Sequence, residues 1–139
     1  MKTVFTLLFI ASSTLLVAQD EAEKLTQTLS GKTWEVVGLT SFDSANPNGI
    51  SINSMDKLKA SSRYMTFTFG EDGKLTCAGS PFAGGFTEWK VISGEEIEMS
   101  KPGKTSSVKI LHLSDEKINI ERENPLMRNK EQMTLQPKS

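Results

Sequence analysis

The sequence has one cysteine and one histidine among its 139 residues. A single cysteine cannot form an intrachain disulfide, so the fold must depend on its apolar core, and we expect Cys77 to be buried on the same face as Leu75. A single histidine excludes a histidine-rich metal site. A serine–histidine–aspartate triad would need His112, and no Gly-x-Ser-x-Gly motif accompanies it. The sequence therefore lacks a convergent set of polar groups, and we predict that the protein is not an enzyme.

Charge of one sign is also not concentrated in any segment. The formal net charge is -1, and the Lys and Arg residues are spread along the chain. Nucleic acids and anionic membrane surfaces bind proteins through concentrations of basic residues. We therefore expect neither of them as a partner.

The one strongly apolar run lies at the N-terminus. Lys2 supplies a charged start, residues 4–17 are apolar apart from four hydroxyl residues, and Ala18 is a small residue suited to cleavage. The run is shorter than the roughly 20 residues that a spanning helix needs, which favours a cleaved signal over an anchor. We predict a signal peptide over residues 1–18 and one domain over residues 19–139. The mature protein is then exported, to the periplasm or outside the cell, with no membrane insertion after signal cleavage.

The rest of the chain alternates apolar and polar residues between short turns. In residues 63–69 the apolar side chains fall on one face, and residues 70–73 form a turn of the Asp-Gly kind. Further strands are expected at 29–39, 74–77, 86–92, 96–99, 106–113, 118–122 and 131–135. Turns this short leave no room for crossover helices, so the strands must pair antiparallel.

An all-β fold follows from this pattern. We predict an antiparallel up-and-down barrel of about eight strands, with a short N-terminal helix over residues 20–29. A two-sheet sandwich is the alternative, although sandwiches usually need longer connections.

Residues 40–62 are the longest irregular stretch. A turn at residues 46–49 and a helical turn at residues 56–60 are expected within it. Long loops in compact domains are usually lids or binding loops, or else disordered. This one carries more large apolar residues than a solvated loop needs: Phe42, Ile50, Ile52, Met55 and Leu58.

The layout resembles the lipocalin-like proteins of the calycin group, in which a glycine and a tryptophan open the first strand. Lipocalins have Gly-x-Trp there, whereas Gly31 and Trp34 are separated by two residues. Family members often place an arginine from a late strand over that tryptophan, and Arg122 and Arg128 are the late arginines of this chain. The resemblance implies a barrel that holds a small, mainly apolar molecule, with no cofactor and usually no catalysis.

Two hypotheses about function remain open. The first is a non-enzymatic barrel that binds a small apolar or amphipathic ligand. Its predicted pocket consists of Phe42, Ile50, Ile52, Met55 and Leu58 from the lid, with Met65, Phe67 and Trp89 below. In the second, these large side chains simply fill the barrel, and the protein is a protein-binding module, such as an inhibitor or an envelope assembly factor. It would then act through its loops, for example with Phe82 as an anchor.

Overall fold

The computed structural model describes residues 18–139, so the predicted signal peptide, apart from its last residue, lies outside the described residues. The described part of the chain begins with a helix over residues 18–29. The elements that follow are β1 (Lys32–Ser41), β2 (Ile50–Ile52), α2 (Met55–Ala60), β3 (Thr66–Phe69), β4 (Leu75–Ala78), the 3₁₀ turn η1 (Pro81–Ala83), β5 (Glu88–Ser93), β6 (Glu96–Lys101), β7 (Lys104–Leu113), β8 (Ile118–Glu123) and β9 (Lys130–Pro137).

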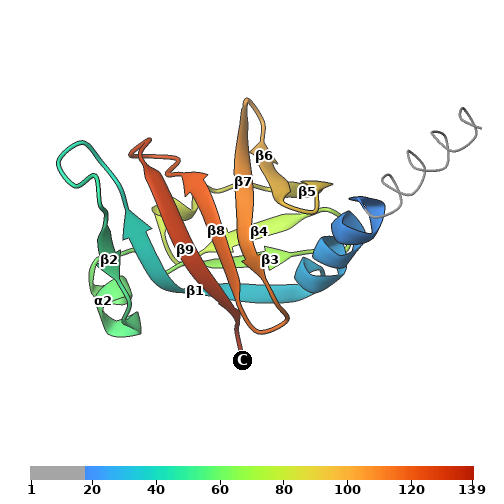
Figure 1. Cartoon of the computed structure of the whole chain (residues 1–139), viewed down its shortest axis with the longest axis horizontal. Coiled ribbons are helices and arrows are strands. Elements are labelled where there is room, and N and C mark those ends of the chain that lie inside the picture. The colour runs from blue at the N-terminus through green and yellow to red at the C-terminus, as the bar shows by residue number, and fades with distance from the viewer. Residues whose placement is uncertain (1–17) are drawn as a thin grey trace, which may run out of the picture.

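Eight of the strands form an antiparallel barrel that is nearly closed (Figure 1). Their order around the wall is β4-β3-β1-β9-β8-β7-β6-β5, so the wall follows the chain order and the last strand returns to the first. Between β4 and β5 the two edges meet through a few bonds only. The Leu75 amide donates to the Thr87 carbonyl at 2.9 Å, and the Trp89 amide donates to the Gly73 carbonyl at 3.0 Å. The predicted barrel and its short N-terminal helix are confirmed.

β1 pairs with three other strands. It pairs with β9 on one side, while on the other its first part pairs with β3 and its last part with β2. A bulge between Val36 and Gly38 lets the strand bend between these partners. A Cβ added at Gly38 would lie 3.2 Å from Oδ1 of Asn53, so glycine allows the segment after β2 to approach the barrel wall closely.

The stretch predicted as irregular is partly ordered. The helical turn expected at residues 56–60 is present as α2, which the Ser54 hydroxyl caps by accepting from the Lys57 amide at 3.3 Å. β2 was not predicted, because a run of three residues is too short to show an alternation. β2 pairs with the last part of β1, on the same edge where β3 pairs with the first part.

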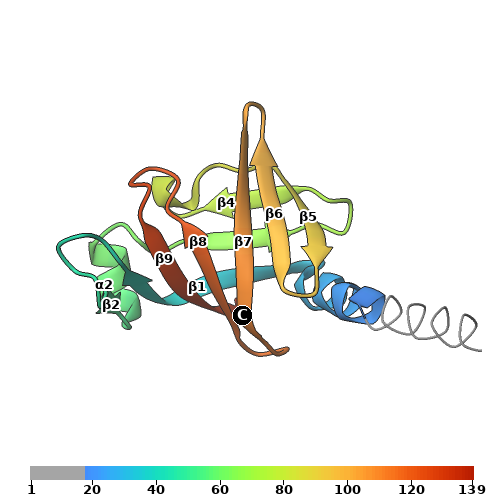
Figure 2. The ribbon, with the colours of Figure 1, turned by 45° about the horizontal axis from the view of Figure 1, so that its top comes forward.

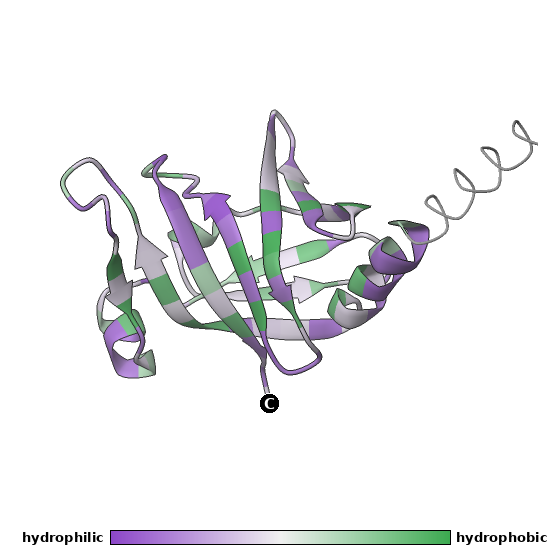
Figure 3. Ribbon diagram, viewed as in Figure 1, coloured by the Kyte–Doolittle hydropathy of each residue, from purple (hydrophilic) through white to green (hydrophobic). Residues whose placement is uncertain are grey.

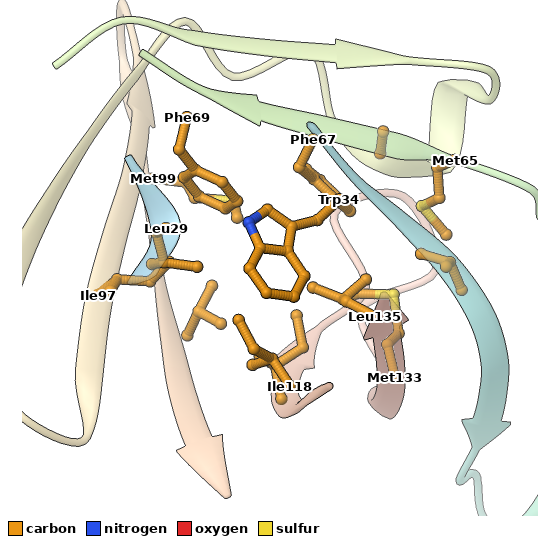
Figure 4. Packing of buried hydrophobic residues seen from close by; sticks show 14 of the residues in the cluster. Leu29, Trp34, Met65, Phe67, Phe69, Ile97, Met99, Ile118, Met133 and Leu135 are labelled. Carbon is orange, nitrogen blue, oxygen red and sulfur yellow. The ribbon is translucent and has the colours of Figure 1, made fainter. Parts of the chain in front are cut away.

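The core fills the inside of the barrel. Apolar and polar residues alternate along the strands (Figure 3), and the apolar set points inward. The Trp34 indole lies in the centre of this cluster (Figure 4), and the N-terminal helix adds Leu25 and Leu29 to it. Phe69 and Trp89 pack edge to face, with ring centroids 5.1 Å apart.

Candidate functional site

The eight residues predicted to line a ligand pocket do not surround one in the described structure. Four of them are buried in the core, namely Leu58, Met65, Phe67 and Trp89. Ile52 and Met55 are half-buried against that core, Phe42 lies on the outside under the Lys130 ammonium, and Ile50 is exposed. The structure therefore brings six of the eight onto one cluster and leaves Phe42 and Ile50 outside it.

Five well-defined pockets of residues 18–139 are surface depressions open to the solvent, and the largest of these five has a volume of about 440 Å³. It lies between the N-terminal helix and the β5–β6 turn, where Glu21, Ile92 and Glu95 line it. None of the five is lined by any of the eight predicted residues. The large inward side chains act as core.

A cluster of buried charges lies at one end of the barrel. Glu131 on β9 is fully buried and accepts from three side chains. Its Oε1 accepts from Nε of Arg122 at 2.9 Å, and its Oε2 accepts from Nη2 of Arg63 at 2.8 Å and from Nδ2 of Asn124 at 3.0 Å. One carboxylate therefore holds two guanidinium groups, and the cluster retains one excess positive charge.

Arg122 fixes the 3₁₀ turn η1 across this end. Its Nη1 donates to the Ala83 carbonyl at 3.0 Å and its Nη2 to the Phe82 carbonyl at 2.6 Å. The Arg63 guanidinium lies 4.3 Å from the centroid of the Phe82 ring. Burial lowers the pKa of Arg122, and the neighbouring Glu131 carboxylate opposes that shift. Phe82 thus packs inward as part of a plug rather than standing out as an anchor.

This cluster was not predicted from the sequence, although a signal for it is present there. Alternation places Arg122 on the same face as Ile118 and Ile120, and Glu131 on the same face as Met133 and Leu135. An arginine and a glutamate on the inward faces of adjacent strands predict a buried ion pair. Arg122 was considered only as a cover for Trp34. In the structure it lies by Phe67 instead, with its Cζ 5.5 Å from the ring centroid.

Trp34 has an unusual environment. The cation nearest its ring is Lys32, whose Nζ lies 5.9 Å from the ring centroid. Its indole Nε1 is buried and has no hydrogen-bond partner among the described residues, whereas Nε1 of Trp89 donates to the Gly70 carbonyl at 3.0 Å. An unpaired buried N–H costs free energy, so this atom marks a place where a polar acceptor would be favourable.

The β8–β9 loop carries the most exposed large apolar side chains of the described residues. Leu126 is 57% exposed and Met127 is 66% exposed. Asn124 is fully buried beneath them, and its Oδ1 accepts from both of their amides at 2.9 Å. Because Nδ2 of Asn124 is bonded to Glu131, the buried charge cluster and this loop form one connected structure.

Titration of Tyr64, the single tyrosine of the chain, tests a hydrogen bond on the outer wall of the barrel beside α2. Tyr64 donates its hydroxyl to Oε2 of Glu35 at 2.8 Å, and burial together with this carboxylate raises the pKa of Tyr64 to about 12. Titration of the folded protein followed by absorbance at 295 nm should therefore give a midpoint near 12. In denaturant the midpoint should return to about 10. Because the pKa of Tyr64 is higher in the folded state than in the unfolded state, the free energy of unfolding should fall as the pH rises from about 10 to about 12. A folded midpoint near the unfolded value would contradict the contact.

His112 and Cys77 are the other residues that the sequence suggests for chemistry. His112 is exposed on β7, and Cys77 is half-buried with Sγ 3.5 Å from the Phe86 carbonyl oxygen. Burial raises the pKa of the Cys77 thiol. Within residues 18–139, no three His, Cys, Asp or Glu side chains gather as metal ligands would. Over the same residues, no helix has the length and apolar character needed to cross a membrane.

No family model matches the chain, and a search of curated proteins finds no significant match. What defines its class is the architecture: an antiparallel, nearly closed barrel of eight strands, consistent with a calycin-like fold.

Proposed function

We propose that the protein is an exported, non-enzymatic binding module with a solid lipocalin-like barrel, which acts through its loops. The packing of the large inward side chains into one core cluster is the observation that carries this proposal. Met65, Phe67 and Trp89, which would line the pocket of a hollow barrel, pack into one core with Trp34. An eight-stranded barrel is of the size that side chains alone can fill. The buried Arg122–Glu131 pair then stabilises η1 across one end.

The loop at the same end has the features of a recognition element. Leu126 and Met127 are exposed, but the backbone that carries them is fixed by Asn124. A loop already held in one conformation loses little entropy on binding. An inhibitor of an exported enzyme or an envelope assembly factor would use a rigid scaffold of this kind to position its loops.

A small apolar ligand inside the barrel is the second candidate. It is favoured by the unpartnered Nε1 of Trp34, which an acceptor on a ligand would satisfy. Met65, Met99 and Met133 lie in the same core, and methionine side chains repack more readily than branched ones. In this case the ligand would displace methionine side chains rather than enter a preformed cavity.

Titration with a hydrophobic fluorescent dye separates the two candidates. We expect the purified protein without its signal peptide to show no saturable, equimolar binding. Trp34→Ala is the matched positive control, because loss of the largest buried side chain opens an indole-sized apolar cavity in the same core, and this variant should bind indole. Circular dichroism establishes that the variant remains folded. Equimolar binding by the unaltered protein would contradict a solid barrel and support the second candidate.

A further inference from the structure

We propose that the end of the barrel that carries Leu126 and Met127 docks onto an anionic lipid bilayer. The docking tip is defined as Leu126, Met127 and Arg128 of the β8–β9 loop with Lys101 and Lys104, which flank the β6–β7 turn. The proposal rests on the function proposed above only in assigning recognition to the loops. The two loops project on the same side of the barrel (Figures 1 and 2).

The shape of the apolar part favours a lipid surface over a protein groove. Leu126 and Met127 are exposed in the loop that joins β8 to β9, so they form a narrow projection of two side chains rather than a broad patch. A projection of two side chains needs a preformed pocket in a protein partner, whereas a bilayer interface deforms around it. Shallow insertion of apolar side chains among lipid headgroups is the binding mode of interfacial segments.

The charges around the projection complement anionic headgroups. The Lys104 Nζ donates to the Pro125 carbonyl at 2.9 Å, which ties the β6–β7 turn to the β8–β9 loop. Lys101, Lys104 and Arg128 form no ion pair within the described part of the chain. Lys104 and Arg128 are exposed, whereas Nζ of Lys101 donates to the Gly84 carbonyl at 2.6 Å, so Lys101 contributes its charge from the base of the tip. Glu123 is the acidic side chain that shares a depression with Lys104 and Arg128, so positive charge remains in excess there. Basic residues beside inserted apolar groups strengthen binding to anionic lipids.

The loop is held in the conformation that presents these groups. Arg128 has a φ of +60°, a left-handed conformation that a non-glycine residue adopts rarely. Its amide donates to the Asn124 carbonyl at 2.9 Å, and the Asn124 amide donates to the Asn129 carbonyl at 2.7 Å. Backbone strain of this kind persists where the surroundings fix it, and it is common at binding sites.

The sequence predicts no anionic membrane partner, because no single segment is rich in Lys and Arg. Lys101 and Lys104 lie far from Arg128 in the chain, so a scan along the sequence does not group them. Antiparallel pairing of β7 with β8 places the two hairpin ends side by side and gathers the charges. The sequence prediction of no anionic membrane partner considers charge segment by segment, whereas the fold groups charges from separate segments on one surface.

Cosedimentation with vesicles tests the proposal. We expect the protein without its signal peptide to bind vesicles of phosphatidylcholine mixed with phosphatidylglycerol, to bind pure phosphatidylcholine weakly, and to dissociate as salt is raised. Leu126→Ser with Met127→Ser should lower the partition coefficient by about tenfold or more, because two apolar groups no longer insert. Lys104→Gln with Arg128→Gln should remove the preference for anionic vesicles. Leu111→Ser is the matched control, since Leu111 is 51% exposed but lies at the other end of β7 from Lys104.

Three outcomes would overturn the proposal. They are no binding to anionic vesicles, binding that the tip variants leave unchanged, and an equal loss in the Leu111 control. If the protein instead self-associates through the tip and ignores vesicles, the tip is a protein–protein surface and the lipid assignment is wrong. Dye titration of the interior decides the solid barrel separately, so the two proposals can fail independently.

Discussion

Glu131→Gln is expected to lower the free energy of unfolding by roughly 3–5 kcal/mol. The carboxylate is fully buried and holds the guanidinium groups of Arg122 and Arg63 at 2.9 and 2.8 Å. A neutral amide leaves the buried Arg122 and the half-buried Arg63 without their counterion, and its NH₂ group faces donors rather than acceptors. The substitution should also loosen η1, because Arg122 is the side chain that fixes it.

Urea unfolding followed by tryptophan fluorescence measures this effect. Glu121→Gln is the matched control, because Glu121 is on the adjacent strand and its contacts are looser: Lys130 at 3.9 Å and Gln132 at 3.0 Å. We expect that control to change stability by less than about 1 kcal/mol. Equal losses for the two variants would show that the buried cluster contributes no more than a surface ion pair.

Trp34→Ala is expected to destabilise the protein by about 3–5 kcal/mol, through the large cavity that it leaves in the centre of the core. Trp34→Phe should cost much less, under about 2 kcal/mol, because most of the ring volume remains and no hydrogen bond is lost at Nε1. Trp89→Phe forms the contrast: it removes the hydrogen bond from Nε1 to the Gly70 carbonyl.

Chemical unfolding of the three variants gives the ranking. The expected order of loss is Trp34→Ala first, then Trp89→Phe, then Trp34→Phe. A Trp34→Phe variant that is less stable than Trp89→Phe would indicate that Nε1 of Trp34 has a partner in solution. A Trp34→Ala variant with nearly full stability would contradict its position in the core.

Much of the fold could be predicted because period-two alternation and short turns are local signals. Met65, Phe67 and Phe69 alternate with polar residues, and the Asp72-Gly73 turn is local in sequence. These features determine strand positions and antiparallel pairing. Whether the barrel is filled is not local: it depends on whether the side chains from eight strands together occupy the interior volume. The same large residues predict a pocket lining or a core equally well.

The buried charge cluster and the fixed β8–β9 loop were not predicted, for a related reason. The Arg122–Glu131–Arg63 cluster joins residues from β8, β9 and the segment before β3, and only closure of the barrel brings them together. The rigid loop under Leu126 depends on Asn124, whose role requires the buried Glu131 as a partner. Inward-facing charged residues on adjacent strands are the sequence feature that would have indicated both.

In the solid barrel that we propose, the side chains leave no room for a ligand. Trp89→Phe leaves Trp34 as the sole tryptophan, so its emission reports on the centre of the core. Titration of this variant with a brominated long-chain fatty acid tests the claim most directly. We predict emission typical of an apolar environment that the fatty acid leaves unquenched. Quenching that saturates at one fatty acid per protein would show that the barrel takes up a ligand beside Trp34, and would contradict the claim.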